Sequence, residues 1–482
     1  MLDRFFGLSE HGTNVRRELL AGVTTFFTMA YIICVQPAIL TGRISGQKTD
    51  MDFGAVFTAT CLSAALATAI MAFYARYPIA QAPGMGQNVF FVLTIIPAAR
   101  ELIANRMAEG TIHADETEPW QIALGVVFAS GVLFLLLTLA GLRQVLLDTI
   151  APSMRYGIAA GIGLFIAFIG LKNVGLVVVG NDHVGLNYHF GSPDLVVFFF
   201  GLLLTAGLFA RRLPGAIFWG IVATTIFAIG LQHCLPYAPA LIAESTVVKM
   251  SGLMTNFHVA QQVVAMPPSI APTLLQMDVK NAVSPQMAPF ILILLFMVVF
   301  DTLGTLVGVA ERAGLIRDNK LPRANEAFAS DAAATVVGAA LGTSTVTSYI
   351  ESVAGVEQGG RTGLTALAVG ALFLLALFFG PVVVMVGSYP PITAPALVIV
   401  GALMVESVTK IDWSNHGESI PAFLILLGIP LSYSIADGLA LGLIAYPVVK
   451  FLAGQARDVK WLMYLIAALL GIYFVMIRAT IG

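Results

Sequence analysis

The stretch QAPGMGQNVFF, residues 81–91, places one proline, two glycines and three side-chain amides inside a long apolar region. A non-helical backbone in a membrane leaves N–H and C=O groups without partners, at a cost of several kcal/mol for each group. Such a stretch is tolerated only where protein shields it or where it lines a polar cavity. The stretch therefore predicts an interruption that either is shielded by protein or lines a polar cavity.

The composition around this stretch is that of a membrane protein. The chain has 482 residues, of which 58% are hydrophobic and 11% are charged, whereas soluble domains are about 25% charged. We therefore expect an all-α polytopic membrane protein. The net charge of −2 and the lack of Lys/Arg runs give no reason to expect nucleic-acid binding. The cysteines and histidines lack metal-ligand spacing, so no metal site is expected.

A membrane span needs about 20 apolar residues. Two sets of seven candidate segments are separated by a polar gap at 233–287. The segment at 418–452 is either one bent element or two short helices. The candidates are 19–41, 54–75, 78–97, 119–139, 153–171, 193–210, 214–232, 288–309, 328–341, 345–357, 363–387, 392–408, 418–452 and 459–478.

Because seven is odd, the two halves must have opposite orientations, which predicts inverted repeats. The third segment of each half is interrupted, by PIAQAPGMGQNVFFVLT (78–94) and by ALGTSTVTSYIESVAG (340–355). Each becomes helix-like after the interruption, so each offers free N–H groups and a positive dipole end near mid-membrane. Two such starts facing each other predict a polar slot for a small planar or anionic solute. The alternative is that the glycines and prolines only permit close helix packing.

Three carboxylates lie in or beside these apolar segments. Asp301 follows a dozen apolar residues, where a carboxylate costs on the order of 3 kcal/mol or more to insert. Glu351 falls near the first turn after the second interruption, where the helix dipole favours a negative charge. Asp331 either caps an apolar helix with Ser330 or provides a second proton site. For Asp301 a structural hydrogen bond, and for Glu351 simple capping, are the alternatives.

Other polar and aromatic residues complete the predicted slot. Asn88 can offer both a donor and an acceptor, and capping is its alternative role. Backbone N–H groups near Ser344 and Thr345 are expected to face acceptor atoms of the solute. Aromatic rings can stack on a planar solute, although core packing is the alternative for each of them. The aromatic candidates are Phe26 in the first segment, Phe90 after Asn88, and Tyr349 before Glu351; Thr25, next to Phe26, is a further polar candidate for the solute site.

At these residues the sequence resembles the second family of nucleobase–cation symporters, in its AzgA-like branch of adenine, guanine and hypoxanthine permeases. The resemblance runs nearly end to end, and the set of motifs in this order is highly specific. Gln36 and Gln87 depart from the family pattern, where Asn and a small apolar residue are expected. The motifs are RRELLAGVTTFFTMAYIICVQPAIL (16–40), APGMGQNVFF (82–91), FDTLGTLVGVAERAGL (300–315), SDAAATVVGAALGTSTVTSYIESVAG (330–355) and GGRTGLTAL (359–367).

The resemblance implies 14 transmembrane segments in two inverted seven-span repeats, as in the uracil permease, with short strands in spans 3 and 10. Lys and Arg predominate in the segments that would be inside if the N-terminus is cytoplasmic, which favours that orientation. The expected units are a core domain at 1–140 and 288–387, a gate domain at 141–232 and 388–482, and an extracytoplasmic connection at 233–287.

The resemblance also implies proton-coupled import of a purine nucleobase across a bacterial inner membrane by an elevator-like movement. Glu351 and Asn88 would bind the base, Asp301 would carry the coupling proton, and Asp331 and Glu351 are further proton candidates. No cofactor beyond H⁺ is expected, Na⁺ coupling and a homodimer are left open, and the protein is not expected to be an enzyme. The alternatives are a transporter of xanthine or uracil, or an anion exchanger on the same fold.

Overall fold

The computed structural model describes residues 2–44, 46–108, 110, 117–141, 151–179, 184–187, 189–239, 245–313, 315 and 322–472. Ten helical stretches of these residues are long and apolar enough to cross a membrane. They are 15–40, 53–75, 85–108, 119–139, 152–173, 193–210, 216–237, 288–306, 363–387 and 390–410.

Among its described residues, the first half of the chain contains mostly helices, together with one strand at the first interruption and a short antiparallel strand pair. Its elements are α1 (Leu2–Phe6), α2 (Val15–Met29), α3 (Ile32–Leu40), α4 (Phe53–Ile70), the π-helix η1 (Met71–Ala75), β1 (Gln81–Pro83), α5 (Met85–Phe90), the π-helix η2 (Phe91–Ile95), α6 (Ile96–Ala108), α7 (Pro119–Leu139), α9 (Pro152–Asn173), β2 (Val177–Val179), β3 (Val184–Leu186), α10 (Pro193–Ala210) and α11 (Ala216–Cys234).

Short helical turns then lead into the second half, whose described residues include the strand β4. The elements are η3 (Leu235–Tyr237), α13 (Thr246–Lys249), α14 (Gly252–Thr255), α15 (Val279–Ala282), α16 (Ala288–Arg312), α17 (Ala324–Leu341), β4 (Val346–Ser348), α18 (Ser352–Glu357), α19 (Gly363–Ala376), η4 (Leu377–Phe379), α20 (Gly380–Gly387), α21 (Pro390–Val405), η5 (Glu406–Lys410), α22 (His416–Ser432), α23 (Ile435–Leu452), η6 (Ala456–Asp458) and α24 (Trp461–Ile472).

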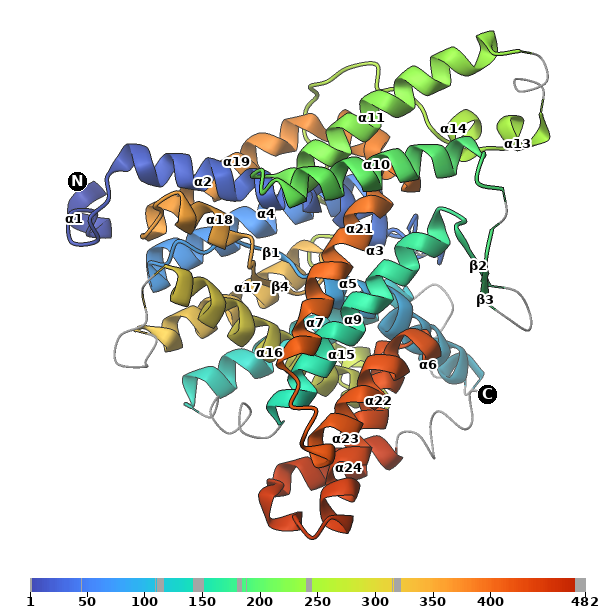
Figure 1. The fold of residues 1–482 in the computed structure, drawn as a ribbon. Helices are drawn as coiled ribbons and strands as arrows, with labels where there is room; N and C mark the ends of the chain where they lie inside the picture. The colour runs from blue at the N-terminus through green and yellow to red at the C-terminus, as the bar shows by residue number, and fades with distance from the viewer. Residues whose placement is uncertain are drawn as a thin grey trace.

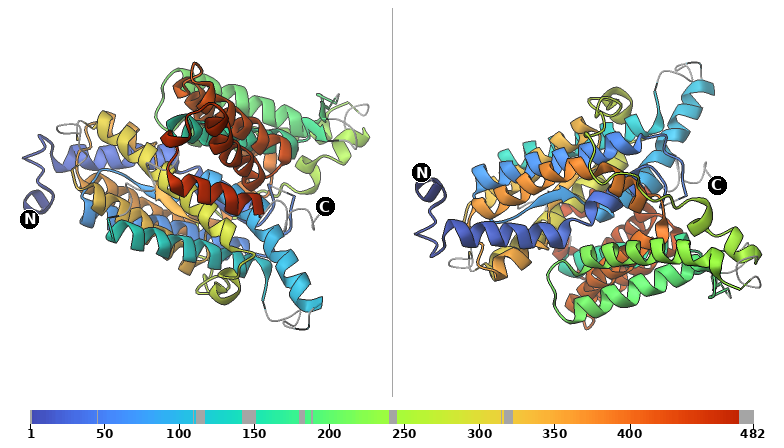
Figure 2. Two further views of the ribbon diagram at one scale, coloured as in Figure 1. Left: turned by 90° about the horizontal axis from the view of Figure 1, so that it is seen from below. Right: turned by 90° about the horizontal axis from the view of Figure 1, so that it is seen from above.

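The helices pack in two groups (Figure 1). In one group α17 packs on α4 and α7, and α19 packs on α2 and α4. In the other, α9 packs on α21 and α22, α10 packs on α11 and α21, and α23 packs on α22 and α24. Both views in Figure 2 place the green α10 and α11 on the same side as the red C-terminal helices, away from the blue α4 and the orange α19. Each group therefore draws its helices from both halves of the sequence.

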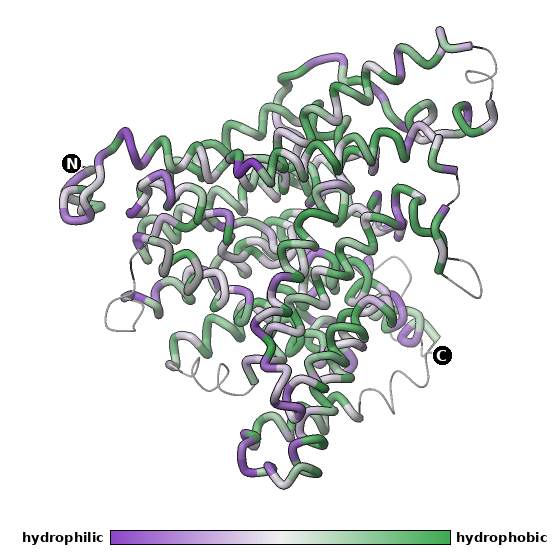
Figure 3. The backbone as a smooth tube through the Cα atoms, viewed as in Figure 1, coloured by the Kyte–Doolittle hydropathy of each residue, from purple (hydrophilic) through white to green (hydrophobic). Residues whose placement is uncertain are grey.

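Apolar residues extend along most of the helices, whereas hydrophilic residues gather at helix ends and connections (Figure 3). Several long apolar side chains on the outer helices are exposed, among them Leu203 at 70% and Ile226 at 65%. A soluble protein would bury such residues, but a lipid-facing helix gains nothing by burying them. This distribution fits a multi-pass membrane protein.

Two predicted spans are broken in the structure, and the alternatives left open for a third are decided. The first, at 19–41, is broken between α2 and α3 at Ala30 and Tyr31. The predicted span at 345–357 is a three-residue strand followed by a six-residue helix, because its Ser/Thr-rich start pairs with another strand. The open question at 418–452 is resolved as two helices, which are separated by Tyr433 in a left-handed conformation (φ 54°). The last predicted segment extends to 478, and its residues from 473 lie outside the described residues.

The N-terminal end of α19 is fixed to α2 by the buried side chain of Glu18. Its carboxylate accepts hydrogen bonds from the backbone N–H groups of Arg361 (2.9 Å), Thr362 (3.2 Å) and Thr365 (3.2 Å). The hydroxyls of Thr362 (2.9 Å) and Thr365 (2.6 Å) donate to the same carboxylate. The first N–H groups of a helix have no partners within it and carry its positive dipole end. Glu18 therefore accepts hydrogen bonds from the first N–H groups of α19 and joins this helix to the first half of the chain.

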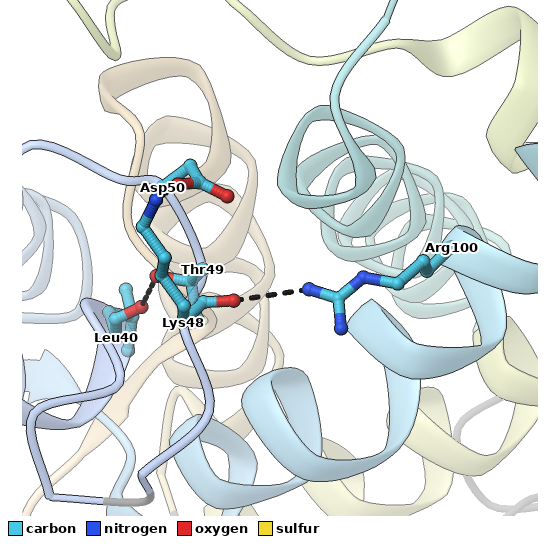
Figure 4. A network of polar contacts seen from close by, with 5 residues as sticks. All are labelled: Leu40, Lys48, Thr49, Asp50 and Arg100. Atoms are coloured by element: carbon cyan, nitrogen blue, oxygen red, sulfur yellow. Dashed lines mark hydrogen bonds and ion pairs between the residues drawn. The ribbon is translucent and has the colours of Figure 1, made fainter. Parts of the chain in front are cut away.

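The connection that follows α3 is held mainly by backbone acceptors (Figure 4). Thr49 Oγ1 donates to the carbonyl of Leu40 at 2.6 Å, and Arg100 Nη2 of α6 donates to the carbonyl of Lys48 at 3.1 Å. Lys48 also forms an ion pair with Asp50 at 2.9 Å, and the hydrogen bond to Asp50 raises the pKa of the Lys48 ammonium. Both partners are exposed, so this pair adds little to stability. The Arg100 contact is what ties the connection to α6.

Candidate solute-binding site

The two sequence interruptions meet as a two-stranded antiparallel ladder. Gln81 pairs with Ser348, Ala82 with Thr347, and Pro83 with Val346, and all six residues are buried. Backbone hydrogen bonds extend the ladder at both ends, from Gly84 N to Thr345 O and from Tyr349 N to Ala80 O, each at 3.0 Å. Each interruption therefore supplies the backbone partners that the other lacks, which is how irregular chain can persist at membrane depth.

Short helices begin directly after both strands. Helix α5 follows Gly84 and continues through η2 into α6, whereas α18 follows Glu351 and ends at Glu357. The first turn of α5 also lies against α9 of the other helix group. A Cβ on Gly86 would lie 2.8 Å from Cγ2 of Ile162, so only glycine allows this close approach. The site therefore lies where the two helix groups touch.

Asp331 is buried in the middle of α17 and binds the ladder to the surrounding helices. Its carboxylate accepts from the Nε2 of Gln81, from the hydroxyls of Thr302 (2.6 Å), Thr347 (3.3 Å) and Ser348 (2.7 Å), and from the backbone N–H of Ser348 (3.1 Å). The expectation that Ser330 and Asp331 begin a helix is wrong, because α17 begins at Ala324. Asp331 instead joins both strands and α16 to α17.

Asp301 lies on α16 next to Thr302, but its surroundings differ. Its side chain is half-buried, and its Oδ2 accepts a hydrogen bond from Nε2 of Gln87 at 3.1 Å. The carboxylates of Asp331 and Glu351 interact with it electrostatically. Asp301 is thus the carboxylate of this cluster that combines partial exposure with a direct contact to α5.

Glu351 occupies the residue before α18, as expected, but it does not cap that helix. Its Oε1 accepts from the hydroxyl of Tyr31 at 2.9 Å, and its backbone carbonyl accepts from Thr28 Oγ1 at 3.3 Å. Tyr31 stands at the break between α2 and α3. The break in the first span therefore aims a buried phenol at the carboxylate of the tenth predicted span.

Asn88 and its neighbours contain polar atoms that lack partners. Ser344 Oγ donates to Asn88 Oδ1, and Gln36 Nε2 donates to Thr343 Oγ1 at 2.8 Å and to Ser344 Oγ at 3.3 Å. Among the described residues, the buried atoms Asn88 Nδ2, Gln36 Oε1 and Thr345 Oγ1 have no hydrogen-bond partner, and neither has Thr25 Oγ1, which lies against Gly355 of α18. A buried polar atom without a partner costs about 1–3 kcal/mol. These atoms could be satisfied by a polar solute.

The aromatic candidates do not gather around these atoms. Tyr349 is held against β1, with its hydroxyl donating to the carbonyl of Pro83 at 2.5 Å. The ring of Phe90 lies 6.5 Å from that of Phe290, and the ring of Phe26 packs edge-on against Phe373 at 5.3 Å. Core packing, the alternative considered for each ring, accounts for these two phenylalanines.

Sequence reasoning missed the residues that connect the two interruptions. Gln81 and Gln87 both lie in the stretch 81–91, and each donates to a carboxylate of the second half. An amide inside a non-helical stretch of a membrane protein was the available signal. For Tyr31 the signal was weaker, because a tyrosine within an apolar segment is common in membrane helices.

The family model described as the permease family matches residues 16–440. This chain belongs to the permease family. The permease is 44% identical to a Methanocaldococcus jannaschii protein named as a permease, over 98% of each chain. It is 38% identical to the guanine/hypoxanthine permease PbuO of Bacillus subtilis, over 96% of this chain and 98% of that one. It is 36% identical to the adenine permease AdeQ of Escherichia coli, over 99% of this chain and 96% of that one. It is therefore a transport protein rather than an enzyme.

Solved structures share the fold of this permease at low sequence identity. The transmembrane domain of the cyanobacterial bicarbonate transporter BicA superposes with a TM-score of 0.58 and 15% identity, covering 90% of this chain and 97% of that one. SLC26A9 superposes with a TM-score of 0.61 and 11% identity, covering 94% of this chain and 68% of that one. These likenesses concern the fold alone.

Proposed function

We propose that this permease imports purine nucleobases together with protons. The observation that carries the proposal is the set of unpartnered buried polar atoms on Asn88, Gln36 and Thr345 at the paired interruptions. A purine presents several ring acceptors and N–H donors within one plane, so one base could satisfy more than one of these atoms. The relatives named as guanine/hypoxanthine and adenine permeases support this class of solute.

In the proposed complex, the base lies between the starts of α5 and α18. Glu351 accepts hydrogen bonds from ring N–H or exocyclic amine groups, and the amide of Asn88 donates to a ring acceptor. The Tyr31 hydroxyl holds the Glu351 side chain from behind, which restricts its rotation before the base arrives. Pre-positioning of this kind lowers the entropy that binding must offset.

Asp301 is the proposed proton carrier. It is half-buried and lies beside α5, so it can exchange protons with a wet cavity while contacting the helix that begins at the solute site. Asp331 accepts five hydrogen bonds, and an acceptor bound by five donors has little capacity to take a proton. This contrast favours Asp301 over Asp331 as the coupling group.

The proposed transport cycle moves one helix group against the other in an elevator-like manner. We assign 14 membrane segments in two inverted repeats, with a cytoplasmic N-terminus in a bacterial inner membrane. The close contact of Gly86 with Ile162 would then be one that forms and breaks during the cycle. A glycine supports such sliding because it has no side chain to interlock with the partner helix.

The experiment is uptake of radiolabelled hypoxanthine by the purified protein in liposomes, competed by unlabelled adenine, guanine, xanthine and uracil. We expect adenine or guanine to compete, xanthine and uracil to compete poorly, and uptake to stop when the pH gradient is collapsed. Competition by uracil alone would move the substrate class to pyrimidines. Uptake driven by a Na⁺ gradient in place of a pH gradient would show that Na⁺, and not H⁺, is the coupling ion.

Anion exchange is the second candidate, because BicA and SLC26A9 share the fold. A fixed positive charge beside the helix starts would favour an anion, whereas this site presents the carboxylates of Asp301 and Glu351. Bicarbonate or chloride flux through the same liposomes, without purine uptake, would favour this candidate instead.

A further inference from the structure

Gln87 is the residue that joins the carboxylate of Asp301 to the helix carrying Asn88. It is the third residue of α5, its side chain is 4% exposed, and its Nε2 donates to Asp301 Oδ2 at 3.1 Å. The next residue, Asn88, carries one of the unpartnered amide nitrogens. The proton site and the solute site are therefore linked through one side chain and one peptide bond.

A side-chain amide is suited to detect whether a carboxyl group is protonated. A carboxylate only accepts hydrogen bonds, so it must face the amide NH₂ group. A protonated carboxyl group can donate its O–H, and the amide oxygen is then the matching acceptor. Gln87 can therefore remain bonded to Asp301 in both states, provided that its amide group turns over when the proton arrives.

The structure keeps space for the amide oxygen at Gly84. A Cβ on this residue would overlap Oε1 of Gln87 and come within 2.9 Å of its Cδ. The backbone of Gly84 has φ −75° and ψ 130°, a conformation that any residue can adopt. Glycine is therefore not needed here for its backbone freedom. Its lack of a side chain leaves room for the Gln87 amide, which an added Cβ would push aside.

Other ionisable or charged groups surround this pair but contact it less directly. Asp331 and Glu351 act on Asp301 through space, as does Tyr349, while Tyr31 is occupied by Glu351. Arg155 of α9 lies over the ring of Phe300, the residue before Asp301, at 5.5 Å. The direct hydrogen bond from α5 to the Asp301 carboxylate comes from Gln87.

We propose that Gln87 is the positioning residue that makes base binding depend on the protonation of Asp301. With Asp301 ionised, its carboxylate holds the NH₂ group of Gln87. When a proton from solution binds Asp301, the acid O–H donates to Gln87 Oε1, and the amide turns so that its NH₂ group is free for a ring acceptor of the base. The inference rests on the proposed function, because it assumes that a base and a proton are carried together.

The test compares Gln87→Leu with the wild type in liposomes, measuring the KM and maximal rate of purine uptake from acidic to mildly alkaline pH. In the wild type, KM should rise with pH as Asp301 loses its proton. Leucine has a similar size but neither donor nor acceptor. Its KM at acidic pH should be about tenfold higher, the loss expected for one hydrogen bond, and its dependence on pH should be nearly flat. Gln276→Leu, at an exposed glutamine that bonds to Gln121, is the matched control.

Gly84→Ala provides a second variant that keeps Gln87 itself. The added methyl group should displace the amide and flatten the pH dependence in the same way. A Gln87→Leu or Gly84→Ala protein that folds, transports and keeps the pH dependence of the wild-type KM would overturn the inference. If the wild type transports no purine at all, the proposed function fails first. If it transports purines and the variants behave as wild type, only the role of Gln87 fails.

Discussion

Replacing Asp331 tests whether this carboxylate braces the site or carries a proton. In Asp331→Ala, the Nε2 of Gln81 and the backbone N–H of Ser348 lose an acceptor and are fixed in place by the ladder. Each buried donor left without an acceptor costs about 1–3 kcal/mol, so the two donors together lower the stability by about 2–6 kcal/mol. The hydroxyls of Thr302, Thr347 and Ser348 can rotate toward other acceptors, so they add less.

The isosteric Asp331→Asn variant makes the comparison sharper. Asparagine keeps one acceptor oxygen but turns an NH₂ group toward donors that previously met a carboxylate oxygen, which we expect to cost about 3 kcal/mol. Asp301→Asn is the matched control, because Gln87, which donates to Asp301, can turn its amide to accept. That control should change stability by less than about 1 kcal/mol.

The assay is the fraction of detergent-purified protein that remains monodisperse after heating, together with purine exchange in liposomes. We expect Asp331→Asn to lose its monodisperse peak at a temperature several degrees below that of Asp301→Asn. The reasoning is refuted if Asp331→Asn has wild-type thermal stability and normal exchange but fails to accumulate purine. That outcome would restore Asp331 to the proton-coupling role suggested by the sequence.

Four variants test the other carboxylates and the tyrosine that bonds to Glu351. Asp301→Asn should abolish uphill accumulation while preserving exchange of labelled for unlabelled base, and full accumulation would remove the residue from the coupling step. Glu351→Ala should raise the KM for purines by more than tenfold. Tyr31→Phe removes only the hydroxyl that donates to Glu351 and should raise the KM less. Equal KM values for the wild type and Glu351→Ala would exclude direct contact between Glu351 and the base. Glu18→Ala should destabilise the protein by about 3 kcal/mol and leave the KM unchanged. Heating of the purified protein measures the stability, and uptake at a permissive temperature measures the KM. Unaltered stability would show that the hydrogen bonds from α19 to Glu18 are replaceable.

The sequence was sufficient to locate the interruptions and the carboxylates, because both are local departures from apolar composition. Pro83 disrupts a helix interior, and the glycines beside it and the Thr/Ser-rich run at 343–348 lower the helix propensity further. A carboxylate in an apolar segment is costly in any context, so Asp301 and Glu351 could be selected without knowledge of the fold.

The partners of these residues could not be predicted in the same way. The bonds of Gln81 to Asp331 and of Tyr31 to Glu351 join residues 250 and 320 positions apart, and no local pattern encodes such a pairing. The start of α17 was missed for a related reason. Residues 324–330 include Asn325, Glu326 and Ser330, which suggest a loop, but tertiary packing buries Ala327 and Phe328 and extends the helix.

The pairing of β1 with β4 also constrains how the chain is made. The phenol of Tyr349 binds the carbonyl of Pro83 across a sequence separation of 266 residues. Ribosomes add about 5–20 residues per second, so roughly 13 to 53 seconds pass between synthesis of the first strand and synthesis of its partner. During this interval the insertion machinery holds a membrane segment whose strand lacks its native partner. The first interruption can reach its final structure only after most of the protein has been translated, and shortening the chain before residue 346 would leave that segment permanently unpaired.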